Sequence, residues 1–133
     1  MDTMRRASPL PFDLNEYLLD ILQHVHRLVP FDSGGLFLLS TATNTLVPHA
    51  YLGDATLVVP SAQLGENIIG PVAAYGFPLI INDMHADRRC VLTDPRSRAE
   101  LAVPLRLDEQ VIGVFNVEAY TPGAYDETHL AVL

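Results

Sequence analysis

The sequence predicts an α+β domain in which helices pack on an antiparallel sheet of five to six strands. Three observations support this prediction. Residues 12–29 carry apolar side chains every three or four positions, as one face of a helix does. Two pairs of short apolar segments, within residues 35–52 and 98–120, are each joined by turn residues and predict hairpins. Asp126 is the expected N-cap of a final helix.

Length and composition favour one globular domain. A chain of 133 residues removes roughly two thirds of its unfolded surface from water when it folds. Its residues are 49% hydrophobic and its mean hydropathy is +0.21. No apolar run reaches the roughly 18 residues that span a bilayer, and no secretory signal is recognisable. We expect a soluble protein without membrane contact.

Charge and cysteine content limit the partners and the compartment. The net charge is -8, the isoelectric point is near 4.8, and the eight basic residues are scattered. Phosphate backbones are bound by clustered Lys and Arg, so we expect no nucleic-acid partner. Cys90 is the only cysteine, which excludes an intramolecular disulfide and favours the cytoplasm.

The first helix is predicted from Phe12 to Val29, after a flexible segment of residues 1–11. Tyr17, Leu22 and Val29 widen its apolar stripe beyond what one sheet face should need. We therefore expect a homodimer through this helix. The alternative is that a longer C-terminal helix covers the extra apolar surface.

Residues 35–39 and 46–52 predict a hairpin around the turn sequence STATNT, and residues 56–60 predict another short strand. Gly65, Gly70 and Gly76 follow. A phosphate-binding loop needs its glycines directly after a strand, or a following Lys-Ser or Lys-Thr, and neither context is present. We expect these glycines to shape a short helix that leads into the strand PLIIND.

The polar residues 84–98 predict a loop that covers the domain as a lid. Two strands follow, RAELAVPLRL and QVIGVFNVEAY, joined at Asp108 and Glu109. Alternation in the second strand places Ile112, Val114, Asn116 and Glu118 on one face.

The register of this hairpin decides where Glu100 lies. A strict two-residue turn would point Glu100 away from Glu118, whereas one bulge, for which Pro104 is a plausible site, would bring the two opposite each other. Two carboxylates and the Asn116 amide would then converge below the lid. Such close like charges predict a ligand with an amine or guanidinium group. The alternative is that both glutamates lie at solvated strand ends.

Three stretches in this order, GENIIGPVAAYGFPLIINDMHADRR, AELAVPLRLDEQVIGVFNVEAY and a helix beginning at YDE, resemble the GAF domain family over about residues 12–133. The resemblance implies N- and C-terminal helices on one face of the sheet. On the other face it implies a small-molecule pocket below a short helix and a loop lid. It also implies a sensory or dimerisation module of a larger signalling protein. The final helix is short, so we expect it to be truncated and an output domain to follow residue 133.

Branches of the family differ in ligand. Cyclic-nucleotide domains carry an Asn-Lys pair where this sequence has Glu118 and Ala119, and bilin domains often follow their cysteine with histidine, where Val91 follows Cys90. Neither branch is favoured. We expect Cys90 to be neither a chromophore anchor nor a redox switch, although Arg88 and Arg89 could lower its pKa.

The sequence is also similar to the free methionine sulfoxide reductases of the family, through SRAELAVPLRLDEQVIGVFNVEAY. Their ligand-holding acidic residues would fall on Glu100, Asn116 and Glu118, and Thr93 stands where their reactive cysteine would be. Their chemistry resolves a sulfenic acid as a disulfide, for which Cys90 has no partner. We therefore expect no enzyme and no catalytic residue. The alternatives are a degenerate enzyme of this type and a purely structural dimerisation domain.

Other chemistry is sparse. His24 and His26 point to different helix faces, and His85 lies in a polar turn, so we expect no metal site. The sequence does not indicate which ligand or cofactor binds. The candidate ligand-binding residues are Tyr51, Leu64, Ile68, Asp83, Thr93, Glu100, Asn116 and Glu118.

Overall fold

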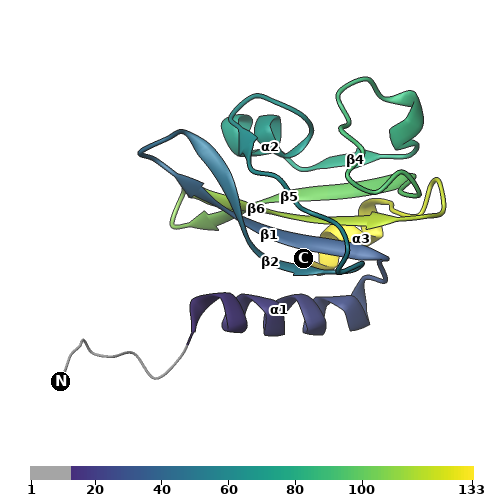
Figure 1. Ribbon diagram of the computed structural model, residues 1–133, viewed down its shortest axis with the longest axis horizontal. Helices are drawn as coiled ribbons and strands as arrows, with labels where there is room; N and C mark the ends of the chain where they lie inside the picture. Colours follow the sequence, from purple (N-terminus) through teal and green to yellow (C-terminus); the bar gives the residue numbers. More distant parts are fainter. Residues whose placement is uncertain (1–12) are drawn as a thin grey trace.

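A computed structural model describes residues 13–133; the predicted segment of residues 1–11, and Phe12, lie outside this range. The elements in chain order are α1 (Leu14–Leu28), β1 (Ser33–Ser40), β2 (Thr45–Leu52), β3 (Ala62–Gln63), α2 (Ile69–Tyr75), β4 (Leu79–Ile81), the 3-10 helix η1 (Met84–Ala86), β5 (Ala99–Leu107), β6 (Gln110–Ala119) and α3 (Glu127–Val132). The strands form one six-stranded antiparallel sheet with the order β3-β2-β1-β6-β5-β4 (Figure 1). The predicted fold class is confirmed.

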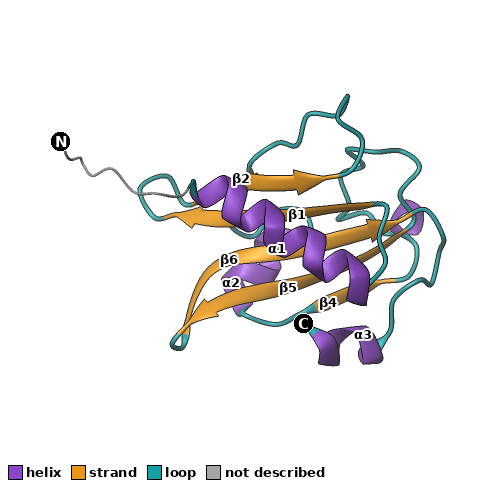
Figure 2. Cartoon of the chain, turned by 90° about the horizontal axis from the view of Figure 1, so that it is seen from below, coloured by secondary structure: helices purple, strands orange, loops and turns teal. Residues whose placement is uncertain are grey.

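Each face of the sheet carries its own core. Helices α1 and α3 lie on one face and α2 on the other, as Figure 2 shows. Leu22 of α1 packs with Leu101 and Phe115 in the first core, and Val72 of α2 packs with Val114 in the second. This is the arrangement that the family resemblance implied. No helix within residues 13–133 has the length and apolar character needed to cross a membrane.

Helix α1 contributes more to the core of its own domain than its sequence indicated. The Asp13 carboxylate accepts from the amides of Asn15 and Glu16 at 2.8 and 3.3 Å, which fixes the start of the helix. Leu22 and Val29 have no exposed surface. The prediction that these two side chains extend the stripe beyond the needs of the sheet is therefore wrong.

Turn chemistry replaces the short strand predicted at residues 56–60. The Asp54 carboxylate accepts from the Thr56 amide at 2.9 Å, and the Leu57 amide donates to the Asp54 carbonyl at 3.2 Å. An aspartate that bonds the backbone two residues on holds the chain in a turn. The strand that pairs with β2 comes later, at Ala62–Gln63.

The glycines around α2 shape the backbone, as predicted. A Cβ on Gly70 would lie 2.6 Å from the Gln63 carbonyl oxygen, so only glycine fits this approach. Gly76 ends α2 with a φ of 75°, in the left-handed region. The short helix thus packs tightly against the segment that enters it and turns directly into β4.

The hairpin of β5 and β6 contains the bulge on which the acidic pair depends. Glu100 lies opposite Glu118. The register shifts between Leu105 and Arg106, where Ile112 has no partner, while Pro104 pairs with Val114. The predicted bulge is confirmed, but the extra residue is Ile112 in β6 and not Pro104 in β5. At 39% exposure, Ile112 is also the residue that departs from the expected buried face.

Candidate functional site

A pocket lies on the α2 face of the sheet. Strands β1, β2, β5 and β6 form its floor, and its walls come from the loop of residues 53–61, the start of α2 and the lid of residues 84–98. The lining residues are Ser33, Gly34, Gly35, Phe37, Tyr51, Leu57, Val59, Pro60, Ala62, Asn67, Ile68, Ile69, Cys90, Val91, Thr93, Asp94, Glu100, Asn116 and Glu118.

Six of the candidate ligand-binding residues line this pocket: Tyr51, Ile68, Thr93, Glu100, Asn116 and Glu118. The structure does not bring Leu64 and Asp83 to it. Leu64 packs against the core of the α2 face. Asp83 instead forms an ion pair with Arg98, at 2.9 Å, and accepts from the His85 amide at the start of η1.

Glu100 and Glu118 form an acidic pair on the pocket floor. They are direct partners across β5 and β6, and Glu100 is only 4% exposed. The Asn116 Nδ2 donates to Glu100 Oε2 at 2.8 Å and to Glu118 Oε2 at 3.3 Å. The ion pairs found within residues 13–133 include neither glutamate. Glu100 is therefore buried and Glu118 half-buried, so neither carboxylate lies at a solvated strand end.

Burial, and then the charge of Glu118, raise the pKa of Glu100, while the hydrogen bond from Asn116 opposes the rise. Burial also raises the pKa of Glu118. Two carboxylates that face each other in a poorly hydrated site do not both ionise readily, so the pair retains a proton more strongly than ordinary carboxyls do. A cation placed between them would favour ionisation of both.

Cys90 lines the same pocket but is not an activated thiol. Burial, and then the charge of Glu100, raise the pKa of Cys90 to about 12. The neighbouring Arg89 cannot offset this, because its guanidinium donates to both oxygens of Asp87 at 3.0 and 2.7 Å. A thiol in this environment stays protonated at neutral pH.

Asp94 is a lining residue that the sequence did not reveal. It is 3% exposed, and its carboxylate accepts from the backbone amide, Nε and Nη2 of Arg96 at 3.0, 2.9 and 3.0 Å. The Tyr120 hydroxyl donates a further bond of 2.8 Å. These bonds, chiefly from Arg96, lower the pKa of Asp94 to about 2. Its local sequence, Asp-Pro-Arg, resembles any polar turn.

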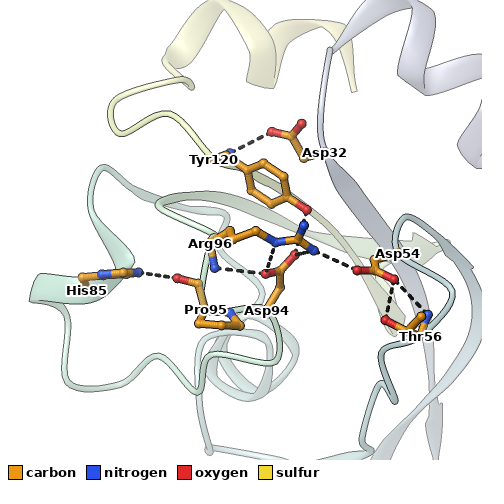
Figure 3. A network of polar contacts seen from close by, with 8 residues as sticks. All are labelled: Asp32, Asp54, Thr56, His85, Asp94, Pro95, Arg96 and Tyr120. Carbon is orange, nitrogen blue, oxygen red and sulfur yellow. Dashed lines mark hydrogen bonds and ion pairs between the residues drawn. The ribbon is translucent and has the colours of Figure 1, made fainter.

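Arg96 also contacts a second loop. Its Nη2 donates to Asp54 Oδ2 at 2.8 Å, and its guanidinium lies 4.9 Å from the centre of the Tyr120 ring. Figure 3 shows the guanidinium held between the two carboxylates. Nothing in the local sequence could have paired Arg96 with a residue 42 positions earlier.

Some metal-capable side chains line the pocket, but the described residues are not grouped as a metal site. Within residues 13–133, no three His, Cys, Asp or Glu residues are grouped so as to hold a metal ion. His24 contacts the Asp20 carbonyl at 2.8 Å and His85 the Pro95 carbonyl at 2.9 Å. The chemical group that stands out in the pocket is the facing pair of carboxylates, which can accept hydrogen bonds from a cation.

Comparison with known proteins agrees with this fold. A family model described as GAF domain matches residues 13–133. Free methionine-R-sulfoxide reductase from Neisseria meningitidis, solved with its substrate, has a TM-score of 0.80 and 24% identity over 90% of this chain and 72% of that one. The type II reductase from Thermoplasma acidophilum has a TM-score of 0.80 and 19% identity, over 91% of this chain and 87% of that one.

A GAF domain from an Acinetobacter phosphoenolpyruvate-protein phosphotransferase has a TM-score of 0.74 and 20% identity, with 90% of this chain and 76% of that one covered. The search of curated proteins returned no match. At identities below 25%, the similarities to solved structures establish the fold alone.

The comparisons correct the expectation that the chain is not an enzyme. Reductases from Neisseria meningitidis, Thermoplasma acidophilum and Staphylococcus aureus share this fold. The argument from a single cysteine was also too strong, because it excludes only an intramolecular disulfide. A separate thiol can resolve a sulfenic acid through a mixed disulfide.

Proposed function

The chain belongs to the GAF domain family, and we propose that its pocket binds a small organic cation, with the amine or guanidinium group between Glu100 and Glu118. The observation that carries this proposal is a pair of facing carboxylates on the pocket floor, one buried and one half-buried, to which no cation of residues 13–133 is ion-paired. Buried charges are normally paired, so a site of this kind favours a ligand that supplies the missing charge.

The residues around the pair have distinct parts in binding. The ligand cation donates to both carboxylates, and Asn116 holds them in place through its two bonds. Phe37, Ile68 and Val59 offer apolar surface for the rest of the ligand, and Tyr51 and Thr93 add hydroxyl groups. This division favours an amine or guanidinium compound with a short apolar body.

Calorimetry tests the proposal directly. The probes are agmatine, L-arginine and L-methionine sulfoxide, with acetamide as a small neutral compound. We expect binding of at least one cationic probe, a tenfold or greater loss in the Glu118→Gln variant, and no binding of acetamide, because a charged hydrogen bond in a buried site contributes about 1.5–3 kcal/mol. Ile112→Gln is the matched control, since Ile112 lies in β6 but outside the pocket lining. Equal affinity in wild type and Glu118→Gln would contradict the proposal.

We also propose that the domain is a regulatory module that self-associates through α1. Leu14, Ile21 and Leu28 leave 47, 36 and 64% of their surfaces exposed along this helix, and such surfaces are often interfaces. Sedimentation should show a dimer that Leu28→Glu dissociates and that Val58→Glu, at an exposed position in the loop of residues 53–61, leaves intact. A wild-type monomer at high micromolar concentration would refute self-association.

A second candidate function is reduction of free methionine-R-sulfoxide, the reaction named for structures that share this fold. The observation that favours it is a thiol, Cys90, in the wall of the acidic pocket. Its sulfur would take the sulfoxide oxygen, releasing methionine and leaving a sulfenic acid. One external thiol would then form a mixed disulfide and release water, and a second would restore Cys90 and leave as the disulfide.

The raised pKa of Cys90 predicts slow turnover. The assay measures methionine formed from the free R-sulfoxide with dithiothreitol as the external thiol. Turnover that Cys90→Ser abolishes would support this second function, and turnover unchanged by Cys90→Ser would exclude Cys90 as its nucleophile.

A further inference from the structure

Two loops that are far apart in the sequence contribute to the walls of the pocket. The loop of residues 53–61 supplies Leu57, Val59 and Pro60, and the lid supplies Cys90, Val91, Thr93 and Asp94. Neither loop is held by strand pairing over these residues. Their relative position therefore depends on contacts between side chains.

Arg96 joins the two loops. Within the lid it bonds the nearly buried Asp94, and across the pocket wall it bonds Asp54, at 2.8 Å (Figure 3). Both acceptors are themselves fixed. Asp54 accepts from the Thr56 amide and hydroxyl at 2.9 and 2.6 Å, and Asp94 accepts from Tyr120, whose backbone amide donates to Asp32. The guanidinium thus connects one anchored carboxylate to another.

The planar guanidinium is suited to this position. Its Nε and Nη2 both reach Asp94, and the same Nη2 also reaches Asp54, while the plane lies against the Tyr120 ring. A lysine has a single nitrogen at its tip and cannot reproduce this set of contacts. The bond to Asp54 is also the more exposed of the two ion pairs: 30% of the Asp54 side chain is accessible, against 4% for Asp94.

We propose that Arg96 is a positioning residue that holds the loop of residues 53–61 against the lid and thereby controls entry to the pocket. The link between Arg96 and Asp54 is the part that opens, because an exposed ion pair is weak and is screened by salt. The link between Arg96 and Asp94 stays formed and keeps the guanidinium in place. Control of ligand entry rests on the proposed binding function, whereas the coupling of the two loops does not.

Amide hydrogen exchange on the whole chain tests the coupling without any ligand. Asp54→Asn keeps an oxygen that can accept from Thr56 but removes the charge that Arg96 contacts. We expect exchange to rise about two- to fivefold in both loops, residues 53–61 and 84–98, the size expected for one exposed ion pair. Raising NaCl from about 50 mM to about 500 mM should produce a similar rise in wild type and little in the variant.

Asp83→Asn is the matched control. Asp83 pairs with Arg98 at 2.9 Å, and both side chains are 36% exposed, so an ion pair of similar kind is lost near the ends of the lid. The ion pair of Asp83 with Arg98 does not involve the loop of residues 53–61, so amide exchange in that loop should stay at the wild-type rate. Arg96→Lys should behave like Asp54→Asn in that loop, since charge alone does not maintain both contacts.

Cys90 reports access to the pocket, because this residue of the lid lines the pocket wall. Labelling by the neutral reagent 4,4′-dithiodipyridine should be about two- to fivefold faster in Asp54→Asn and unchanged in Asp83→Asn. If exchange in Asp54→Asn rises only next to residue 54, the two loops are not coupled. If exchange rises in both loops but Cys90 is labelled at the wild-type rate, Arg96 does not control entry to the pocket. Neither result depends on the ligand, so failure here is distinct from failure of cation binding.

Discussion

Two buried acidic groups border the same pocket, and they are stabilised in opposite ways. Asp94 receives its bonds from an arginine, a backbone amide and a tyrosine. Glu100 receives a bond from a neutral amide and faces a second glutamate. Arg96 is ion-paired with the first carboxylate, whereas no cation within residues 13–133 is ion-paired with the second.

The pKa values follow this difference. Hydrogen bonds from Arg96 lower the pKa of Asp94 to about 2, and burial with the nearby Glu118 raises that of Glu100. Exposure alone cannot explain the contrast, since the two residues are 3% and 4% exposed. A buried carboxylate therefore serves as a structural anchor when the chain supplies its cation, and is available for a ligand when the chain does not.

The largest effect should come from removing Arg96, the cation that is paired with Asp94. Arg96→Ala leaves the buried Asp94 without its ion-pair partner, and we expect a clear loss in the free energy of unfolding. The loss is smaller than for a fully buried pair because 55% of the Arg96 side chain is exposed. Urea denaturation measures it. The double variant Asp94→Asn with Arg96→Ala should recover part of the loss; no recovery would mean that the charge of Asp94 is not the cause.

The next largest effect is on the pH dependence of stability, to which Glu100 and Asp94 contribute in opposite directions. The pKa of Glu100 is raised on folding, so its stabilising contribution is complete below the ordinary value of about 4.3 and is lost as the pH rises through the folded value. The pKa of Asp94 is lowered, so its contribution is present above about 3.9 and is lost as the pH falls towards about 2.

The Glu100→Gln variant should therefore be more stable than wild type at pH 9, by about 1 kcal/mol, and closer to it at pH 4. Asp94→Asn should show the reverse, with its deficit largest at neutral pH and smallest near pH 2. Denaturation curves across this range test both. Parallel curves for wild type and Glu100→Gln would mean that Glu100 does not titrate differently in the folded state.

A smaller effect concerns protons released when a cation binds. An ammonium between Glu100 and Glu118 favours ionisation of both, so binding near neutral pH should release up to about one proton. Calorimetry in phosphate and in Tris, whose ionisation enthalpies differ, measures this number. Glu100→Gln should release none, and equal heats in the two buffers for wild type would contradict a shared proton.

The sequence was sufficient for the parts of the fold that depend on local patterns. Alternation predicted β5 and β6, and Asp126 was identified as the N-cap of the final helix. The register of the hairpin was left open, because a bulge of one residue reverses every side chain beyond it and leaves little trace in the sequence. Glu100 and Glu118 were therefore candidates on the sequence alone, and the structure places them together.

The contacts of Arg96 with Asp54 and Asp94 could not be predicted from the sequence. Asp54, Asp94 and Arg96 lie in polar segments without periodicity, and their contact spans 42 positions. The apolar stripe of α1 misled in another way, because the breadth of a stripe does not show how much of it one domain can cover. Leu22 and Val29 are buried within the domain itself.

The smallest expected effect concerns the Cys90 thiol, which lines the same pocket as the two acidic groups. The charge of Glu100 contributes to the raised pKa of Cys90, second to burial, and Asp94 is not among the groups that raise it. Glu100→Gln should therefore lower the pKa of Cys90, and its labelling between pH 8 and pH 10 should rise about twofold to threefold. A lower pKa moves the profile of rate against pH, whereas easier access multiplies the rate equally at every pH. A proportional increase would show that Glu100→Gln had loosened the lid, and an unchanged profile would show that the charge of Glu100 does not reach the thiol.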